Sequence, residues 1–590
     1  MTEATRVLHP CGARNGVLAL ASFAATTTLL SSSASCARAL PAAAADTRYA
    51  AEIPGPVSRT TTLLEAEATE TTGTISATST TLHTPGAEAS GRRYVSLEPG
   101  QRVTWRAPVA SDGLVVRFSY PDAPEGGGLD GTLAIDADGA VRSLPVSSRY
   151  TWDYGAPKWG TTNVWTSDPG AGSPRHYWDE ASLRLPSSLA AGARVSVTNP
   201  EGSGRAVLID FLELDSVPPP VAPPAGSLSF ADFEPAADGK TDDSSKLALA
   251  IARARSEGRV LYVPEGTYAI GSIELEEGTI QGAGLWRTRF VGSTARFRFG
   301  GGRIRVADFA IFGETAVRDD RSDVGNAFAG RPGPGSVIER IWVEHKKCAF
   351  WVSNGGADRG PTGLRISGCR FRDLMADAVN LCNGTSDTIV DNCDVRNSGD
   401  DGLAAWSPEG KTPAGGHNTF AFNTVQSPWV ASGISLYGGG PFRVVGNTIR
   451  DTVTTGSGIY VAAAFRSHAL RGLVDVRDNV LVRCGAHESD FGTPAGAIRI
   501  LAVDRDITGA DLAFQSNRVV SPLESAVSIH GPHTIENLHL ADLTVEDAPW
   551  VVDVRAGARG SATFRGVKVV GTSPELWRNL AGEAFAVTRW

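Results

Sequence analysis

A short strand-like pattern recurs along the C-terminal part of this 590-residue chain, from about residue 339 onward. Each copy ends on a large or branched apolar residue, as Ile366–Phe371 does. If the residue two places before that apolar position is taken as an anchor, the anchors fall at positions 341, 369, 393, 423, 447, 479, 517, 543 and 567. Steps of 24 to 38 residues are typical of solenoids, in which every repeat is one coil and stacked coils bury a continuous core. The spacing therefore predicts a β-solenoid.

The segment that precedes the repeats supports this fold. Asp and Ser residues lead into an Ala- and Leu-rich run, which predicts a helix over Lys246–Arg255, and the apolar run at Val260–Val263 follows. This order resembles the N-terminal cap and first coil of the right-handed parallel β-helix of pectate-lyase type. The chain also has 66 glycines and 34 prolines, which favours a turn-rich, all-β architecture. We expect residues 227–590 to form such a β-helix.

Four asparagines occupy equivalent anchor positions in the repeat, namely Asn423, Asn447, Asn479 and Asn517. Asparagine tolerates a turn and can stack as an amide ladder between coils, so we expect these side chains to be structural. Cys369 and Cys393 are anchors too. We therefore expect the cysteines to be buried small apolar residues rather than reactive groups.

The chain before the solenoid divides into three further parts. Residues 46–216 alternate short apolar runs with Gly, Pro and Asp turns, which predicts a β-sandwich. Residues 217–226 are rich in proline and predict a semi-rigid linker, so the two domains should be separable. Residues 1–45 have Arg6 and Arg14 before an apolar run and an alanine-rich end after it, which is the layout of a secretory signal peptide.

Charge and hydropathy limit the possible partners. The formal net charge is −9, which gives no electrostatic reason to expect a nucleic-acid partner. No stretch after residue 45 approaches the roughly 18 apolar residues that a membrane span needs. We expect a secreted, extracellular protein that acts as a monomer and has no membrane partner.

Aromatic residues gather in the predicted sandwich at Trp152, Trp159 and Trp165, among polar neighbours. Exposed indole faces can stack on sugar rings, so the cluster predicts a carbohydrate-binding surface; the alternative is that these side chains belong to the sandwich core. The runs at Leu64–Glu67 and Leu208–Leu214 resemble the first and last strands of carbohydrate-binding module families 6 and 35.

That resemblance implies a possible structural calcium ion held by Glu65, Glu67 and Asp210, because carboxylate oxygens suit a hard cation. The alternative is that all three are ordinary exposed acids. No cofactor is expected for catalysis.

Three aspartates become interpretable once the repeat is anchored. Asp377 and Asp401 each lie eight residues beyond an anchor on consecutive coils, and Asp400 adjoins the second. Neighbouring strands lie about 4.8 Å apart, so these carboxylates should crowd together on one face. Like charges oppose each other's ionisation, which suits one acid to protonate a leaving oxygen while another carboxylate activates water. The alternative is a pair of solvated surface turns.

The residues around these aspartates resemble glycoside hydrolase family 87, the α-1,3-glucanases and mycodextranases. The likeness runs through the segments 376–385, 397–407, 423–429, 433–439 and 456–460. It implies an inverting hydrolase of α-1,3-glucan or mixed α-1,3/1,4-glucan (nigeran), with Asp377 as acid and Asp400 and Asp401 as water activators. It also implies substrate-binding roles for Asn380, Trp406, Trp429 and Tyr437.

Three other functions compete with this hypothesis. A polygalacturonase would share the fold, but the Gly-His-Gly and Arg-Ile-Lys patterns of that family are lacking; 496–501 matches the latter only in part. A dextranase would share the adjacent aspartate pair. A noncatalytic glycan-binding β-helix would bind glucan without releasing reducing ends and would leave the stacked aspartates without a purpose.

Overall fold

The computed structural model describes residues 55–58, 60–155, 165–320, 322–352, 360–410, 412–452, 455–489, 491–571 and 576–590. The predicted signal peptide in residues 1–45 lies outside these residues, and so does Trp159. Within the described part of the chain, we find no helix with the length and apolar character needed to span a membrane.

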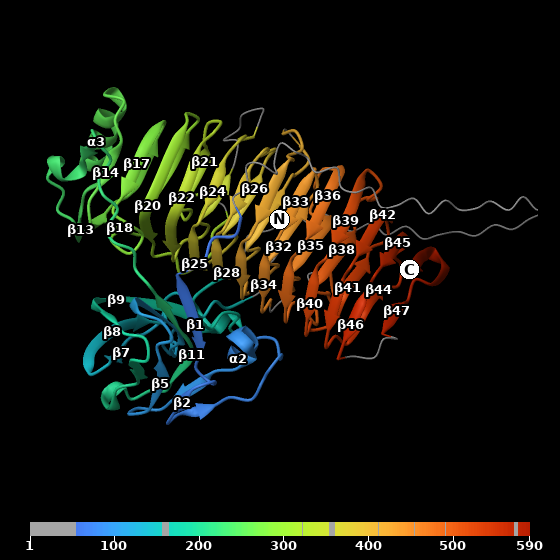
Figure 1. Cartoon of the computed structure of the whole chain (residues 1–590), viewed down its shortest axis with the longest axis horizontal. Coiled ribbons are helices and arrows are strands. Elements are labelled where there is room, and N and C mark those ends of the chain that lie inside the picture. Colours follow the sequence, from blue (N-terminus) through green and yellow to red (C-terminus); the bar gives the residue numbers. More distant parts are fainter. Residues whose placement is uncertain are drawn as a thin grey trace, which may run out of the picture. The chain divides into compact units, whose positions relative to one another are not determined.

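The described chain begins with a β-sandwich of two antiparallel sheets that share one apolar core, to which residues such as Leu114, Val116, Ile135 and Val195 contribute. Blue to teal strands show it in Figure 1. One sheet has the order β3 (Thr74–Ile75), β4 (Val95–Leu97), β11 (Val207–Asp215), β6 (Ser111–Ser119) and β9 (Asp179–Leu189), with β1 (Thr61–Glu65) also paired to β11. The other has the order β2 (Glu70–Thr71), β5 (Arg102–Arg106), β10 (Arg194–Thr198), β7 (Asp130–Ala137) and β8 (Ala140–Ser147), and a short helix α2 (Pro85–Glu88) lies between β3 and β4 in the chain.

A helix, α3 (Ser244–Ser256), precedes the solenoid coils and extends slightly beyond the predicted Lys246–Arg255. Its Leu247, Ala250 and Ile251 are buried, together with Ala254 one turn on. This i, i+3, i+4, i+7 spacing gives one apolar stripe, which joins the solenoid core. The helix therefore covers the first coils and keeps their apolar interior from water.

The solenoid is a right-handed parallel β-helix whose strands follow each other in chain order from the green to the red end of Figure 1. In the coils that hold the aspartates, each turn contributes two strands to one long sheet and a third to a second sheet. The long sheet has the described strands β12 (Leu228–Ser229), β13 (Asp238–Asp242), β14 (Leu261–Val263), β15 (Gly266–Ala269), β17 (Gly278–Gly282), β18 (Thr288–Val291), β20 (Ile304–Phe312), β22 (Val337–Glu344), β24 (Arg365–Ser367), β25 (Arg370–Leu374), β27 (Ile389–Asp391), β28 (Asp394–Ser398), β30 (Asn418–Ala421), β31 (Thr424–Gln426), β33 (Phe442–Val445), β34 (Thr448–Arg450), β36 (Gly472–Arg477), β37 (Val480–Val482), β39 (Ala510–Gln515), β40 (Arg518–Val520), β42 (Thr534–Ala541), β43 (Thr544–Glu546), β45 (Arg559–Arg565), β46 (Lys568–Val570) and β48 (Phe585–Arg589). The second has β16 (Ser272–Leu275), β19 (Arg296–Gly300), β21 (Phe328–Arg331), β23 (Phe350–Val352), β26 (Val379–Cys382), β29 (Leu403–Trp406), β32 (Ile434–Tyr437), β35 (Ile459–Ala463), β38 (Ile498–Ala502), β41 (Ser525–His530), β44 (Trp550–Val554) and β47 (Trp577–Asn579).

The bend between the first two strands of a coil lies at the sequence anchors. The residue before the anchor takes the left-handed conformation, with φ of 53° at Asn392, 66° at Gly446 and 57° at Asp478. The anchor asparagines themselves do not have this conformation, so the turn falls one residue earlier than predicted. Asn, Asp and Gly are the residues that adopt left-handed φ at least cost, which explains their frequency just before the anchors.

The predicted asparagine ladder is present at these bends. Asn423 Nδ2 donates to Asn447 Oδ1 at 3.0 Å, and the same contact links Asn447 to Asn479 and Asn479 to Asn517, each at 2.9 Å. Each of these acceptor oxygens also receives a backbone N–H from the preceding coil. Because the ladder satisfies buried polar groups on these consecutive coils, it helps to fix their register in the stack.

The five described cysteines are buried, as predicted. Cys369 and Cys393 lie in the solenoid core.

The sandwich and the solenoid share a buried ion-pair network. Arg396 of β28 contacts Glu180 of β9 at 2.9 Å and Glu213 of β11 at 3.0 Å, and all three side chains are at most 3% exposed. Arg117 of β6 donates to Asn397 Oδ1 at 2.9 Å. Separating the sandwich from the solenoid would leave these buried charged side chains without their partners, and the free energy would rise by several kcal/mol. These contacts argue against the expectation that the proline-rich linker makes the two domains separable, which stays a prediction.

The ladder predicts the effect of a substitution at its centre. Asn447→Ala leaves the backbone N–H of Asn423 and the carbonyl of Phe420 without their partners. We expect the free energy of unfolding to fall by about 1–3 kcal/mol, measured by chemical denaturation. Gln515→Ala, at an exposed position of β39, is the control and should change little. Equal stability of both variants would show that the ladder does not hold the coils.

Candidate active site

Asp377 and Asp401 meet on the face of the second sheet, each two residues before a strand. Val379 of β26 pairs with Leu403 of β29, and the N–H of Ala378 donates to the carbonyl of Asp401 at 3.2 Å. This is the register that the sequence spacing predicts. Asp400 completes the group, and one carboxylate oxygen from each aspartate lies within 4.8 Å of the other two.

Asp377 is buried, with 4% of its surface exposed, and its carboxylate accepts a hydrogen bond of 3.3 Å from Asn380 Nδ2. Burial raises the pKa of Asp377 well above its ordinary value, and the charges of Asp400 and Asp401 raise it further. Asp377 therefore keeps its proton to a higher pH than an ordinary aspartate does.

Asp401 is held by three donors from the next coil. Its Oδ1 accepts from the Ser432 N–H at 2.9 Å and from Ser435 Oγ at 2.7 Å, and its Oδ2 accepts from Tyr437 Oη at 3.0 Å. Burial and the neighbouring Asp400 raise the pKa of Asp401 to about 8, against the effect of these hydrogen bonds. The donors fix the orientation of the carboxylate and stabilise its ionised form when a proton leaves.

Asp400 is paired with an arginine that sequence reasoning missed. Arg318 Nη1 donates to Asp400 Oδ2 at 2.6 Å, and its Nε donates to Asp320. Both Arg318 and Asp320 come from the segment between β20 and β21, more than 50 residues before the aspartates, and no motif marks them. The positive charge compensates part of the negative charge of the three carboxylates.

A cavity of about 330 Å³ opens over the aspartates. The predicted substrate-binding residues Asn380, Trp406 and Tyr437 line it. Sequence reasoning did not select Tyr460 and Phe465, which also line it and pack edge-to-face on Tyr437 with ring centroids 5.4 and 5.0 Å apart. Trp351 lines the cavity too. Apolar rings beside carboxylates suit a neutral sugar, whose rings stack on aromatic faces while its hydroxyls hydrogen-bond.

The other described tryptophans that were predicted to bind substrate, Trp152, Trp165 and Trp429, do not line this cavity. Trp429 is 1% exposed and packs edge-to-face on Trp165, which is 5% exposed, with centroids 5.5 Å apart. His176 stacks on Trp429 at 4.5 Å. Trp152 is half-buried and donates its Nε1–H to the Tyr120 carbonyl at 2.8 Å. The structure thus places Trp165 and Trp429 in a core, which was the alternative for Trp165.

Trp429 instead packs against the turns that carry Asp377 and Asp400. A Cβ at Gly399 would lie 2.6 Å from the Trp429 ring and 2.4 Å from the Met375 carbonyl, so only glycine fits there. Trp429 Nε1 also donates to the Leu374 carbonyl at 3.3 Å.

The residues suggested as calcium ligands lie in the sandwich but form no common cluster within the described residues. Asp210 is ion-paired with Arg117 and accepts the Ser90 N–H, while Glu65 accepts from Ser90 Oγ at 2.6 Å. Because Arg117 is ion-paired with the Asp210 carboxylate, that carboxylate is not available to calcium. Calcium at Glu65 and Glu67 stays a prediction.

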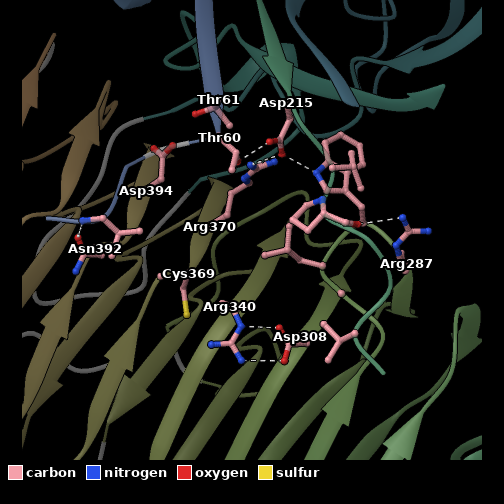
Figure 2. A pocket seen from close by; sticks show the side chains of 18 of the residues that line it. Thr60, Thr61, Asp215, Arg287, Asp308, Arg340, Cys369, Arg370, Asn392 and Asp394 are labelled. Carbon is pink, nitrogen blue, oxygen red and sulfur yellow. Dashed lines mark hydrogen bonds and ion pairs between the residues drawn. The ribbon is translucent and has the colours of Figure 1, made fainter. Parts of the chain in front are cut away.

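A larger cavity of about 490 Å³ lies beside the linker, but its charged groups are already paired. Figure 2 shows Arg340 facing Asp308, and Arg370 reaching Asp215. These contacts measure 2.6 Å and 2.8 Å. Because paired groups of this kind are not free to transfer protons, this cavity is a poor candidate for the chemistry.

Comparison with known proteins matches the two parts of the chain to two family models. Residues 60–217 match the α-1,3-glucanase catalytic domain D1, and residues 238–518 match domain D2. The structure is similar to the catalytic unit of the thermostable family 87 α-1,3-glucanase from Streptomyces thermodiastaticus strain HF3-3, with 30% identity and a TM-score of 0.80, over 90% of this chain and 96% of that one. The chain belongs to glycoside hydrolase family 87.

Two further solved structures share the fold. The Agl-KA catalytic domain is 27% identical, with a TM-score of 0.84, over 91% of this chain and 98% of that one. A family 87 α-1,3-glucanase catalytic domain in complex with nigerose is 22% identical, with a TM-score of 0.76, over 90% and 99%. No curated protein sequence matches the chain.

The family match changes the interpretation of the sandwich. It corresponds to catalytic domain D1, and the resemblance to carbohydrate-binding modules is not confirmed. The protein is a glycoside hydrolase of the α-1,3-glucanase family and cleaves α-1,3-glucan.

The packing of Trp165 on Trp429 predicts that a sandwich residue affects turnover without touching the cavity. Trp165→Ala should lower the free energy of unfolding by about 3–5 kcal/mol and reduce kcat on soluble oligosaccharides. Trp590→Ala, at an exposed tryptophan, is the matched control. If Trp165→Ala weakened only binding to insoluble glucan, with stability and kcat unchanged, the structural role would be wrong.

Proposed function

We propose that this enzyme hydrolyses α-1,3-glucan by a single displacement with inversion, in which Asp377 protonates the leaving oxygen and the pair Asp400–Asp401 activates water. The observation that carries the proposal is the grouping of three carboxylates from consecutive coils at one cavity. The raised pKa of Asp377 suits the acid, and the ion pair of Asp400 with Arg318 suits the base, whereas the pKa of about 8 means that Asp401 must lose its proton before it can act as a base.

Asp377 suits the acid. Its burial and its two carboxylate neighbours favour the protonated form, so it can carry a proton to the glycosidic oxygen. As that oxygen leaves, Asp377 becomes ionised beside Asn380, whose Nδ2 can donate to the new charge.

The aspartate pair suits the base. Arg318 contacts Asp400, and three donors contact Asp401, so the structure provides partners for negative charge on both. A water molecule beside this pair can lose its proton to a carboxylate as its oxygen attacks the anomeric carbon.

The cavity favours a neutral glucan over a polyuronate. Within its described lining, Arg318 is the only basic side chain, and it is already ion-paired with Asp400 and Asp320. A galacturonate carboxylate would therefore meet carboxylates rather than an arginine fork. The aromatic group Tyr437, Tyr460 and Phe465 provides apolar faces for glucose rings.

Inversion rests on the family resemblance rather than on distance. Inverting enzymes commonly separate their carboxyl groups by about 6.5–9.5 Å, whereas here oxygens of the three aspartates lie within 4.8 Å. The backbones that carry an acid and a base on adjacent coils lie one strand spacing apart in inverting and retaining enzymes alike. The short distance between these carboxylates therefore does not decide the stereochemistry. The attacking water in this proposal lies beside the pair rather than between Asp377 and Asp401.

We further propose that the enzyme acts outside the cell on polymeric α-glucan, as a monomer. The support is the signal-peptide layout of residues 1–45 and the size of the polymer, which cannot enter a cell intact.

The acid and base roles predict that substitution of each aspartate lowers activity to a different extent on different substrates. On α-1,3-glucan, Asp377→Asn should reduce kcat about 10²–10⁴-fold, measured as reducing sugar released, because the amide cannot donate the proton. On an α-glucosyl fluoride, whose leaving group needs no proton, Asp377→Asn should keep most activity, whereas Asp400→Asn and Asp401→Asn should lose it. Asp475→Asn, at an aspartate of β36 outside the cavity, is the control.

Near-normal cleavage of α-1,3-glucan by Asp377→Asn would remove that residue from the acid role. Mixed α-1,3/1,4-glucan, dextran and polygalacturonate complete the panel; faster release from dextran or polygalacturonate would contradict the proposed specificity.

The pH profile provides a second test through Arg318. Burial is the main cause of the raised pKa of Asp377, and the Arg318 charge opposes it. Arg318→Gln should therefore raise that pKa further and keep Asp377 protonated to higher pH. In the profile of kcat/KM against pH, the alkaline limb should then move to higher pH. Arg318→Lys keeps the charge and should leave the limb near its original position. An unmoved limb in Arg318→Gln would show that Asp377 is not the titrating acid.

A further inference from the structure

A second group of acids lies where the sandwich meets the solenoid, outside the catalytic cavity. Asp179 begins β9, Glu344 ends β22, His345 follows it, and Asp373 lies in β25. Each offers one ligand atom, and these atoms lie within 4.8 Å of one another. The three carboxylates are buried.

Two oxygens of this group have no hydrogen-bond partner among the described residues. They are Glu344 Oε2 and Asp373 Oδ2, on residues that are 5% and 2% exposed. Buried polar atoms in folded proteins are nearly always hydrogen-bonded, and an exception commonly marks a bound ion or water. These orphaned oxygens point to a missing ligand.

Charge pairing gives an independent argument. The adjacent acids Glu180 and Glu213 are paired with Arg372 and Arg396. By contrast, within the described residues no arginine or lysine lies at ion-pair distance from Asp179, Glu344 or Asp373, and the imidazole of His345 is their one cationic neighbour. Three ionised carboxylates beside one imidazole are costly to bury, so the group must take up protons or bind a cation.

We propose that Asp179, Glu344, His345 and Asp373 bind one divalent first-row transition cation, Mn²⁺ or Zn²⁺, that joins the sandwich to the solenoid. Three carboxylates and one imidazole form a mixed oxygen and nitrogen ligand set that suits these ions better than calcium, which prefers oxygen alone. His345 Nε2 already faces the acids, at 2.7 Å from Asp179 Oδ1 and 4.0 Å from Glu344 Oε1.

The imidazole is also held in place. Tyr150 stacks on the His345 ring with centroids 3.8 Å apart and an interplanar angle of 18°. Ligation through Nε2 needs that nitrogen without its proton, which passes to solvent while Nδ1 keeps the other. The His345 side chain is 14% exposed, which gives the ion a path from water.

The catalytic aspartates form a different kind of cluster. Their oxygens contact Arg318 and the donors on Ser435 and Tyr437, they open to a cavity, and no described histidine belongs to the group. A test can therefore separate the two clusters by substitution.

The test is a titration of the chelator-treated full chain with Zn²⁺ and with Mn²⁺ by isothermal calorimetry. We expect about one ion per chain. Glu344→Gln and Asp373→Asn should each bind at least about tenfold more weakly, whereas Asp400→Asn and Glu546→Gln, at a half-buried acid on β43 outside the group, should bind as the wild type does.

A thermal melt and a spectrum complete the design. The ion should raise the Tm of the wild type but not of Glu344→Gln. Co²⁺ in place of Zn²⁺ should give visible absorption that changes in His345→Gln. No ion bound by the folded wild type, an unchanged Tm, or binding lost in Asp400→Asn but kept in Glu344→Gln would overturn the proposal. The wild-type melt decides the outcome even if a variant does not fold.

Discussion

The stacking of coil on coil at one strand spacing is the constraint on which the active site depends. The asparagine ladder and the continuous apolar core fix the register of each coil against the next. Asp377 and Asp401 stand side by side because β26 and β29 are in that register. A slip of one residue would turn one of them into the core. The stability of the stack and the geometry of the catalytic residues therefore depend on the same register.

The sandwich takes part in this arrangement, although none of its described residues lines the catalytic cavity. Its Trp165 and His176 pack on Trp429, which in turn packs against the turns that hold Asp377 and Asp400. Buried arginines of the solenoid neutralise acids of β9 and β11. The two parts therefore form one catalytic unit, in agreement with the family models that assign both to the α-1,3-glucanase catalytic domain.

Much of this could be predicted from sequence because it repeats. The anchor spacing predicted the solenoid, the ladder and the in-register aspartates, since each of these depends on contacts between equivalent positions on neighbouring coils. Arg318 could not be predicted in this way, because a segment outside the repeat brings it to Asp400. Trp165 was misread as a binding residue for a related reason: its polar neighbours in sequence do not show that Trp429, more than 250 residues away, covers it.

The central claim is that Asp377 and the Asp400–Asp401 pair act in one displacement by water. The most direct measurement is the anomeric form of the first product, followed by proton NMR during hydrolysis of a soluble α-1,3-linked oligosaccharide. Single displacement predicts that the β-anomer appears first and the α-anomer only later, through mutarotation. An initial α-anomer would mean that one of the three aspartates forms a covalent bond to the sugar, and it would contradict the roles assigned to them.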